Sequence, residues 1–243
     1  MGAMTVSVAL AAYNGEKYLA DQIASVLPQL GAGDEIIISD DLPGGGTQKV
    51  AEFYAAYDRR VTYIQGPGRG VCRNFENAVR ACSGELVFLC DQDDVWLPGK
   101  VDKMKKEFEK GAKVVLHDAK VTDENLRVTA ESYFALHKSR TGFLSNFIRN
   151  SYVGCCMAFT SDFRNIILPF PEGLPMHDWW IGLLGELWNC VGVIEEPLIL
   201  YRRHSGTVTG SGSTAAQKLV WRANMAASLA GRVFAGKINR GGK

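Results

Sequence analysis

Short apolar runs alternate with longer segments of helical periodicity along the first half of the chain. The runs at residues 6–10, 35–39, 61–64 and 86–90 are nearly continuous in apolar residues. Helical patterns follow them at residues 15–29, 47–57, 71–81 and 98–111. Strands without in–out alternation are typical of a parallel sheet that is covered on both faces. The pattern therefore predicts an α/β fold with a Rossmann-like, mostly parallel sheet flanked by helices.

The second half of the chain is less regular. A further strand is expected at residues 114–116, a helix at 176–187, and two short strands within 191–200 around Pro197. The pattern does not order the mixed region between residues 118 and 168. No internal repeat is evident, so we expect a single α/β architecture rather than an array.

Composition narrows the class of protein. A 243-residue chain with 47% hydrophobic and 22% charged residues is not disordered, fibrous or membrane-spanning, and it holds no apolar run of a transmembrane helix's length. Its six cysteines show no CxxC or Cys/His ligand spacing, which predicts structural thiols and a reducing, cytoplasmic compartment. Residues 1–4 are expected to be a cloning remnant.

Charge is distributed unevenly. Residues 211–243 carry six cations and no acid, whereas residues 1–210 carry 21 basic and 26 acidic side chains. A cationic helix is expected at residues 218–235. Its apolar contacts would be Trp221, Met225, Leu229 and Phe234. Two interpretations stay open: peripheral contact with the anionic inner face of the plasma membrane, and a packing or dimerisation helix.

Polar residues follow four of the predicted elements at one edge of the sheet. They are Tyr13-Asn14, Asp40-Asp41, the turn Gly66-Pro67-Gly68-Arg69-Gly70, and Asp91-Gln92-Asp93-Asp94. Ligands of open α/β sheets bind beyond the carboxyl ends of the strands. We therefore expect these four segments to converge on a ligand site.

The acidic run at Asp91-Gln92-Asp93-Asp94 is the strongest chemical signal. In an extended segment, Asp91 and Asp93 project to the same side, where a hard divalent cation such as Mn²⁺ or Mg²⁺ would relieve their repulsion. A solvated acidic turn before the next helix is the alternative. An EF-hand is excluded because its sixth position would be Trp96 instead of glycine.

The pair Asp40-Asp41 offers acceptors for a nucleobase or a ribose, and a turn or cap acid is an equal alternative. No GxGxxG follows the first strand, which argues against a dinucleotide-dependent dehydrogenase, and no GxxxxGK[ST] is present. A nucleic-acid partner is not expected.

Two further polar segments lie in the second half. In Met176-His177-Asp178-Trp179-Trp180, aromatic rings could pack on a sugar while a desolvated Asp178 acts as general base. The alternative is that both tryptophans belong to the core. In Tyr201-Arg202-Arg203-His204, cations and an imidazole suit a diphosphate and its metal, and a solvated basic loop is the alternative.

Together these pieces resemble a family 2 inverting glycosyltransferase of the GT-A fold, especially its bacterial rhamnosyltransferase-like branch. The resemblance is carried by Ala11-Ala12-Tyr13-Asn14-Gly15, Ser39-Asp40-Asp41, Cys90-Asp91-Gln92-Asp93-Asp94-Val95-Trp96, His177-Asp178-Trp179-Trp180 and Tyr201-Arg202-Arg203-His204. These motifs span residues 5–210. The family usually has a Gly-Ser/Thr-rich turn and another acid after the paired aspartates, where this chain has Leu42-Pro43-Gly44-Gly45-Gly46.

The resemblance implies roles for individual residues. The donor nucleotide would be bound by Ala11, Tyr13, Asp40, Arg73 and Asp91. Asp93 would bind Mn²⁺ or Mg²⁺, His204 would approach the metal or the diphosphate, and Asp178 would be the general base. His177, Trp179 and Trp180 would contact the acceptor or the sugar.

The resemblance also implies partners and a division of the chain. The donor would be dTDP-rhamnose or a UDP-hexose, and the acceptor a glycan or lipid-linked glycan of bacterial surface polysaccharide synthesis. Residues 5–117 would form the donor half, 118–210 the acceptor and catalytic half, and 211–243 a basic helical tail. A haloacid-dehalogenase-like phosphatase, suggested by the DxDx[TV] match at Asp91, and a non-catalytic glycan-binding subunit are the alternatives.

Overall fold

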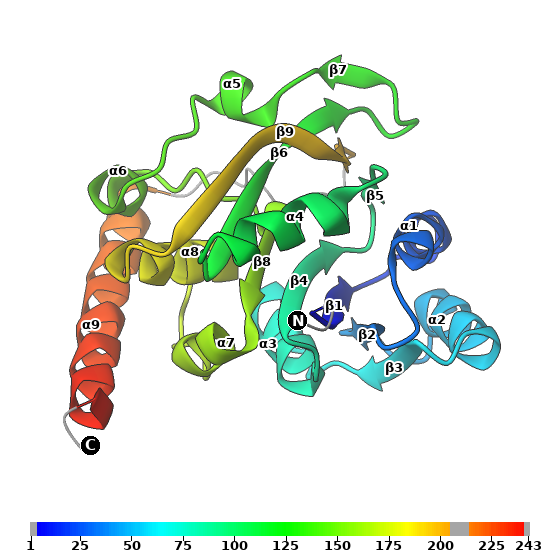
Figure 1. Ribbon diagram of the computed structural model, residues 1–243, viewed down its shortest axis with the longest axis horizontal. Helices are drawn as coiled ribbons and strands as arrows, with labels where there is room; N and C mark the ends of the chain where they lie inside the picture. The colour runs from blue at the N-terminus through cyan, green and yellow to red at the C-terminus, as the bar shows by residue number, and fades with distance from the viewer. Residues whose placement is uncertain (1–3, 205–213, 241–243) are drawn as a thin grey trace.

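The computed structural model describes residues 4–204 and 214–240, with side chains given up to residue 234, and a mixed sheet between Val6 and Arg202 is its main element (Figure 1). The strand order is β3-β2-β1-β4-β8-β6-β9-β5, and β7 pairs with β6. Predictions for Lys237, Arg240 and Lys243 fall on side chains outside the described residues.

The first four strands form the predicted parallel sheet. They are β1 (Val6–Ala12), β2 (Glu35–Asp40), β3 (Val61–Gln65) and β4 (Leu86–Asp91). The pairs β1–β2, β1–β4 and β2–β3 are all parallel. Every residue of β1 is buried, because helices cover both faces of the sheet.

The helices of this half lie on opposite faces of the sheet. They are α1 (Leu19–Val26) with the short η1 (Leu27–Gln29), α2 (Gly46–Tyr57), α3 (Val71–Ala81) and α4 (Lys100–Glu109). Val8 and Leu10 of β1 pack in the core cluster that contains Ile23 of α1. Ala9 of the same strand packs in a second core cluster with Phe75 of α3. Small strand side chains there let the helix approach the sheet closely.

Two helices begin later than the sequence indicates. Helix α1 begins at Leu19 instead of residue 15, after a turn. Helix α4 begins at Lys100 because Gly99, with φ +81°, places a left-handed residue directly before it. These differences are confined to the helix ends, which sequence patterns define least well.

The second half completes the sheet with strands of both directions. Its elements are β5 (Val95–Trp96), β6 (Val114–Thr122), β7 (Val128–Ala130), α5 (Tyr133–His137), α6 (Phe143–Ile148), η2 (Gly154–Cys156), β8 (Met157–Thr160), α7 (Ser161–Ile167), α8 (His177–Leu187) and β9 (Val191–Arg202). Strand β8 is antiparallel to both β4 and β6, whereas β6 and β9 are parallel.

The prediction of two short strands within residues 191–200 is wrong. A single strand, β9, runs through Pro197, and the interruption is a shift in its register with β6. His117 pairs with Ile194 and the next residue, Asp118, pairs with Pro197. A bulge absorbs the proline without ending the strand.

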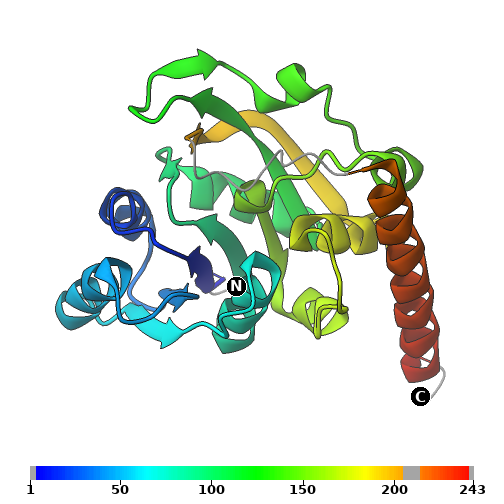
Figure 2. The same ribbon diagram turned by 180° about the vertical axis from the view of Figure 1, so that it is seen from behind.

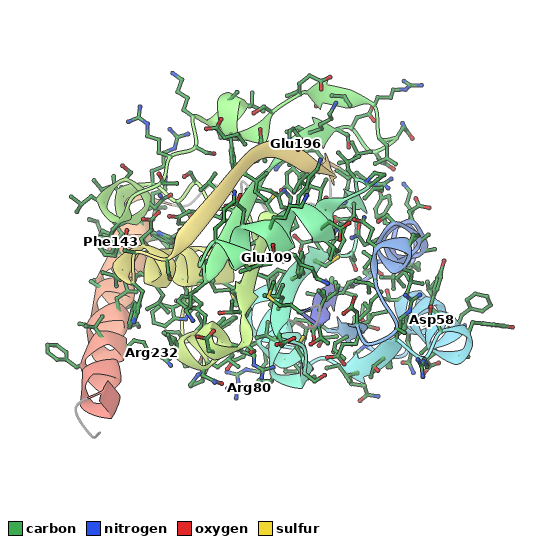
Figure 3. The ribbon with its side chains drawn as sticks, in the orientation of Figure 1. Asp58, Arg80, Glu109, Phe143, Glu196 and Arg232 are labelled. Carbon is green, nitrogen blue, oxygen red and sulfur yellow. The ribbon has the colours of Figure 1, made fainter. Side chains whose placement is uncertain are left out.

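Helix α9 (Ala215–Arg240) packs along the side of the molecule, beside α6 and α8 (Figure 2). Met225 and Leu229 are buried in the second core cluster. Arg232 points toward the body and donates hydrogen bonds to the carbonyls of Leu168 and Pro169 (Figure 3). The packing interpretation of the tail is therefore confirmed at Met225 and Leu229, whereas the expected contact of Phe234 is wrong because its side chain is 66% exposed. Within the described residues, no helix has both the length and the apolar composition needed to cross a bilayer.

Met225→Asp is expected to release α9 from the body, because a buried apolar side chain would be replaced by an unpaired charge. Trypsin cleavage after Arg222 and Arg232 should then become at least about tenfold faster, since local opening exposes both sites. Ala227→Asp, on the exposed side of the same helix, is the control and should leave the rate unchanged. Equal rates in the two variants would contradict the docking of α9.

Candidate active site

The carboxyl ends of β1, β2 and β4 lie side by side. In the sheet register Ala12 pairs with Asp40, and Ala11 lies opposite Asp91. Ala11, one of the predicted donor-site residues, therefore lies between the two acidic strand ends. Its small side chain is buried in the second core cluster.

Gln92 ties the first strand end to the fourth. Its side-chain amide accepts a hydrogen bond from the Tyr13 backbone N–H at 2.8 Å and donates one to the Tyr13 carbonyl at 2.9 Å. The same amide lies so close to Gly15 that a Cβ there would collide with it at 1.9 Å. The Tyr13 side chain is 60% exposed, so its ring is available to a ligand.

Asp40 and Asp41 have different surroundings. Asp41 accepts hydrogen bonds from the backbone N–H groups of Gly68 and Gly70, each at 2.7 Å, and so holds the glycine-rich turn. Asp40 is fully buried, and its carboxylate accepts from the Leu42 N–H at 3.1 Å. Burial raises the pKa of Asp40. With these contacts, the predicted convergence of the four strand-end segments is confirmed.

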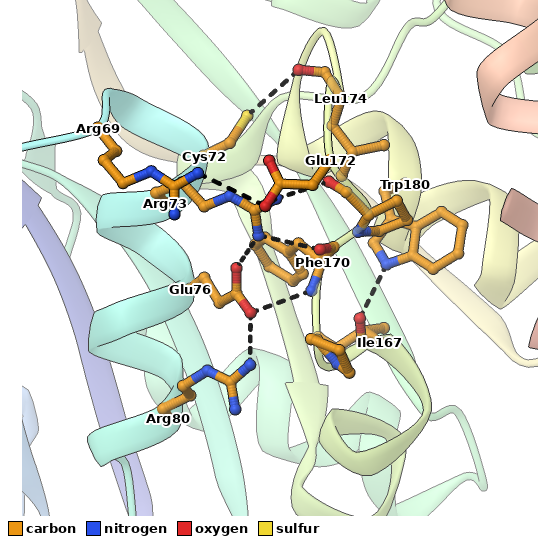
Figure 4. Close-up of polar contacts among 12 residues, drawn as sticks. Arg69, Cys72, Arg73, Glu76, Arg80, Ile167, Phe170, Glu172, Leu174 and Trp180 are labelled. Atoms are coloured by element: carbon orange, nitrogen blue, oxygen red, sulfur yellow. Dashed lines mark hydrogen bonds and ion pairs between the residues drawn. The ribbon is translucent and has the colours of Figure 1, made fainter. Parts of the chain in front are cut away.

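Arg73 forms a network with the segment that precedes α8 (Figure 4). Its guanidinium pairs with Glu76 and Glu172 and donates to the carbonyls of Phe170 and Pro171. These contacts join α3 to the acceptor half of the chain. The guanidinium of Arg73 is therefore engaged by protein partners. The nucleobase role expected for Arg73 stays a prediction.

The acidic motif brings together a different trio from the pair that sequence reasoning chose. One ligand atom from each of Asp91, Asp94 and Cys155 lies within 4.8 Å of the other two. Desolvation and repulsion by neighbouring acids raise the pKa of Asp91, and burial raises the pKa of Asp94 to about 7. The Cys155 thiol, which lies next to both carboxyl groups, opposes both shifts.

Asp93 and His204 lie next to this trio and contact each other. The distance from His204 Nε2 to Asp93 Oδ2 is 2.7 Å. Arg202 fixes the turn by donating from Nε to the Asp93 carbonyl at 2.7 Å and from its backbone N–H to Asp94 Oδ1 at 3.0 Å. The two residues that the resemblance implies for the metal are thus adjacent in space.

This donor set fits a divalent cation. Within the described residues, the buried Oδ2 of Asp94 has no hydrogen-bond partner, although its carboxyl group is surrounded by other acids. A cation bound by carboxylate oxygens would remove the repulsion and satisfy that oxygen. We therefore take Asp91 and Asp94, with Asp93 and His204 beside them, as the residues able to hold Mn²⁺ or Mg²⁺.

Asp178 lies in the first turn of α8, where its carboxylate is buried but well hydrogen-bonded. Oδ1 accepts from the Trp179 N–H at 2.5 Å and from Asn150 Nδ2 at 3.2 Å, and the Gly154 N–H also bonds to the group. Burial nevertheless raises the pKa of Asp178 to about 7. A carboxyl group with a pKa near neutrality is suited to general-base chemistry.

The short helix η2 connects the base to the acidic trio. Gly154 bonds to Asp178, and the Cys155 thiol lies within 4.8 Å of carboxylate oxygens of Asp91 and Asp94. The fully buried Lys100 donates a hydrogen bond from Nζ to the Cys155 carbonyl at 2.9 Å. The same Nζ lies 4.1 Å from the centroid of the Trp96 ring. Burial lowers the pKa of Lys100.

The aromatic residues around the base belong largely to the core. Trp180 has no exposed surface and donates from Nε1 to the Ile167 carbonyl, so the expected sugar contact is wrong for this residue. Trp179 is also buried, with Nε1 bonded to the Asn146 carbonyl. The alternative interpretation, a core role, therefore describes both rings.

His177 supports the site from the inside. Its ring stacks on Phe75, with centroids 4.0 Å apart, and Nε2 lies 2.6 Å from where a Cβ of Gly154 would be. Burial lowers the pKa of His177 to about 3, so the imidazole is neutral. This position behind η2 makes His177 a packing partner of the site rather than a surface for acceptor contact.

Sequence reasoning missed four residues of this arrangement: Gln92 as a bridge, Lys100, Asn150 and Cys155. Lys100 alone left a signal, because it occupies a core position in the helical series with Met104 and Phe108. A charged residue at such a position indicates a buried ionic or polar role. Asn150 and Cys155 lie in a region without periodicity.

Comparison with known proteins agrees with this geometry. A family model described as Glycosyl transferase family 2 matches residues 7–166. The dTDP-rhamnosyl transferase RfbG of Shigella flexneri is 24% identical over 220 residues, which cover 83% of this chain and 74% of that protein. The putative glycosyltransferase EpsE of Bacillus subtilis is 32% identical over 107 residues, which cover 43% of this chain and only 38% of that protein.

Solved structures share the fold. TarS 1–349 of S. aureus in complex with UDP-GlcNAc has a TM-score of 0.70 and 20% identity, covering 87% of this chain and 62% of that one. The mannosyltransferase PcManGT of Pyrobaculum calidifontis, in complex with GDP-Man and Mn²⁺, has a TM-score of 0.59 and 12% identity, covering 97% and 75%. The GT-A-like α/β fold is thus confirmed. Because the family model matches well over half of its length, the chain belongs to glycosyl transferase family 2.

Proposed function

We propose that this chain is the catalytic part of an inverting, metal-dependent glycosyltransferase of bacterial surface polysaccharide synthesis. One observation carries the proposal. A base candidate with a pKa of about 7, Asp178, and a trio able to hold a cation are joined through the same three-residue helix, η2. Donor and acceptor chemistry would therefore meet at one point at the edge of the sheet.

On the donor side, the ends of β1, β2 and β4 would receive a nucleoside diphosphate sugar. Tyr13 offers an exposed ring to the base, and Asp91 lies beside Ala11 where a ribose could bind. When bound by Asp91 and Asp94, Mn²⁺ or Mg²⁺ would supply neutralisation of diphosphate charge. The named donors of relatives support dTDP-rhamnose or a UDP-hexose such as UDP-GlcNAc.

On the acceptor side, ionised Asp178 would take the proton of an acceptor hydroxyl onto a carboxylate oxygen. The hydroxyl oxygen forms a bond to the anomeric carbon while the bond from that carbon to the diphosphate oxygen breaks. A single displacement of this kind inverts the anomeric configuration. Asn150 and the Gly154 N–H would keep the carboxylate oriented toward the acceptor.

A cavity of about 310 Å³ is lined by Ser151 and Val153, which adjoin in the chain the two residues, Asn150 and Gly154, that bond to Asp178; it could take part of the acceptor. Its lining also includes the apolar Leu116 and Val193 and the polar Arg140. Ser151 follows Asn150 directly, so the cavity wall and the hydrogen-bond donor to Asp178 belong to one loop. We propose a glycan or lipid-linked glycan as the acceptor, which would place the protein at the inner face of the membrane.

The two alternative functions have less support. Membership of family 2 leaves no support for a haloacid-dehalogenase-like phosphatase, whose nucleophile usually follows the first strand, whereas Asp91 ends the fourth strand of the chain. A non-catalytic glycan-binding subunit would bind nucleotide without turnover, and the variants below distinguish it.

Nucleotide binding should depend on the metal. In calorimetric titrations of UDP and dTDP, the preferred nucleotide should bind at least about tenfold more tightly with Mn²⁺, because the cation offsets diphosphate charge. Asp91→Asn should remove this enhancement, whereas the control Asp102→Asn, an exposed acid of α4, should keep it. If Mn²⁺ increased nucleotide affinity equally in both variants, Asp91 would not be a metal ligand.

Asp178→Asn should lower turnover by about 10²–10⁴-fold while nucleotide affinity with Mn²⁺ stays unchanged, because the amide cannot accept the proton. Asp162→Asn is a matched control, since Asp162 is an exposed acid in the first turn of α7. Transfer is measured with each donor and an undecaprenyl-diphosphate-linked sugar. Undiminished turnover in Asp178→Asn would assign the base to another residue.

The raised pKa of Asp178 also predicts a pH-dependent change in stability. Below about pH 4 the group is protonated in both folded and unfolded chains. Between about pH 4 and 7 only the unfolded chain releases the proton, so this group lowers the free energy of unfolding as pH rises. Asp178→Asn removes that penalty and should be more stable than wild type at pH 8 by a few kcal/mol.

Urea unfolding with EDTA at pH 8 and at the lowest pH that keeps the protein folded measures this effect. The advantage of the variant should shrink toward the acidic end. A difference that is independent of pH would show that Asp178 titrates normally in the folded protein.

A further inference from the structure

Positive charge is concentrated in two segments that contain no acid. Residues 132–161 and 197–243 together hold 11 of the 27 lysines and arginines but none of the 26 aspartates and glutamates. The rest of the chain holds 16 cations and 26 acids. The chain is nearly neutral overall, so this separation gives it one strongly cationic region and one acidic region.

The two acid-free segments meet where α6 lies beside the first turns of α9 (Figures 1 and 2). Arg222 of α9 donates a hydrogen bond to the carbonyl of Ile148, the last residue of α6. Three apolar side chains are well exposed here: Leu144 and Ile148 on α6, at 73% and 63%, and Leu219 on α9, at 67%. Leu144 and Ile148 are four residues apart, so they share one side of the helix.

Three cations accompany these apolar side chains: Arg149, Lys218 and Arg222. Together the six residues Leu144, Ile148, Arg149, Lys218, Leu219 and Arg222 define the α6–α9 surface. None of its cations forms an ion pair within the described residues, whereas lysines and arginines elsewhere pair repeatedly. Exposed apolar side chains bordered by cations that have no acidic partner are the composition of a surface that contacts anionic lipid.

We propose that the α6–α9 surface docks this protein onto an anionic lipid bilayer. The leucines and the isoleucine would enter the boundary between headgroups and acyl chains, and the three cations would contact lipid phosphates. A second copy of the chain fits less well, since two copies of the α6–α9 surface would bring six cations together without an acid. The proposal concerns lipid contact alone and does not depend on the transfer reaction.

Flotation of the purified chain with phosphatidylcholine vesicles, with and without phosphatidylglycerol, tests the proposal. Wild type should float with the anionic vesicles only, and less at high salt. Arg149→Glu/Lys218→Glu should reduce binding by about thirtyfold or more, since each cation near an anionic surface contributes roughly fivefold. Leu144→Gln/Leu219→Gln should reduce it with the cations intact. Arg222 is left unchanged because it joins α6 to α9.

Helix α2, with Arg59 in the turn that follows it, supplies matched controls on the far side of the molecule (Figure 1). It exposes Phe53 and Tyr57, at 58% and 78%, but also carries Glu52. Phe53→Gln/Tyr57→Gln and Lys49→Glu/Arg59→Glu should bind vesicles like wild type.

The proposal is overturned if wild type does not bind anionic vesicles or binds neutral vesicles equally well. It is also overturned if α2 variants lose as much binding as α6–α9 variants, or if light scattering finds a dimer that only the α6–α9 variants abolish. Nucleotide binding with Mn²⁺ confirms that each variant is folded.

Discussion

Three carboxyl groups with raised pKa values, those of Asp91, Asp94 and Asp178, lie around the three-residue helix η2 at the carboxyl end of β4. Placing acids together away from water is unfavourable unless donors or cations oppose their charge. The chain supplies only partial compensation: backbone N–H groups, the Cys155 thiol, and the buried Lys100, which bonds to the carbonyl of Cys155 rather than to an acid. The remaining negative charge has to be offset by a bound cation or by protonation, so the site favours both.

The topology of the sheet explains how such a cluster can be held in place. Strand β8 runs antiparallel to β4, with Phe88 opposite Ala158 and Leu86 opposite Thr160. Consequently β8 starts near the carboxyl end of β4, and η2, which directly precedes β8, lies beside Asp91. A parallel strand in this position would have brought its other end to the site. The reversal in strand direction that makes the sheet mixed is thus what delivers the Gly154 N–H and the Cys155 thiol.

The sequence was sufficient to predict the parallel half and the convergence of its strand ends, because uninterrupted apolar runs mark strands buried on both faces. It pointed to the acidic run but paired Asp91 with Asp93, whereas the structure groups Asp91 with Asp94 and Cys155. It was also sufficient to predict the raised pKa of Asp178. The packing of Trp180 was not predictable, since an aromatic residue beside an acid looks the same whether it faces a sugar or the core. Nor was η2, because the contacts of Cys155 depend on a strand reversal that no local pattern records.

The separation of charge bears on how the site would be oriented at a lipid surface. Outside the two acid-free segments, acids outnumber cations by 26 to 16, and the acidic cluster at the strand ends belongs to that part. An anionic bilayer repels this part and attracts the α6–α9 surface, which selects one orientation without any specific lipid contact. In that orientation the loop between α5 and α6, which lines the cavity of about 310 Å³ through Ser139 and Arg140, lies next to α6 at the docked surface. A lipid-linked acceptor would then approach the base from the membrane side, while the donor reaches the strand ends from solution.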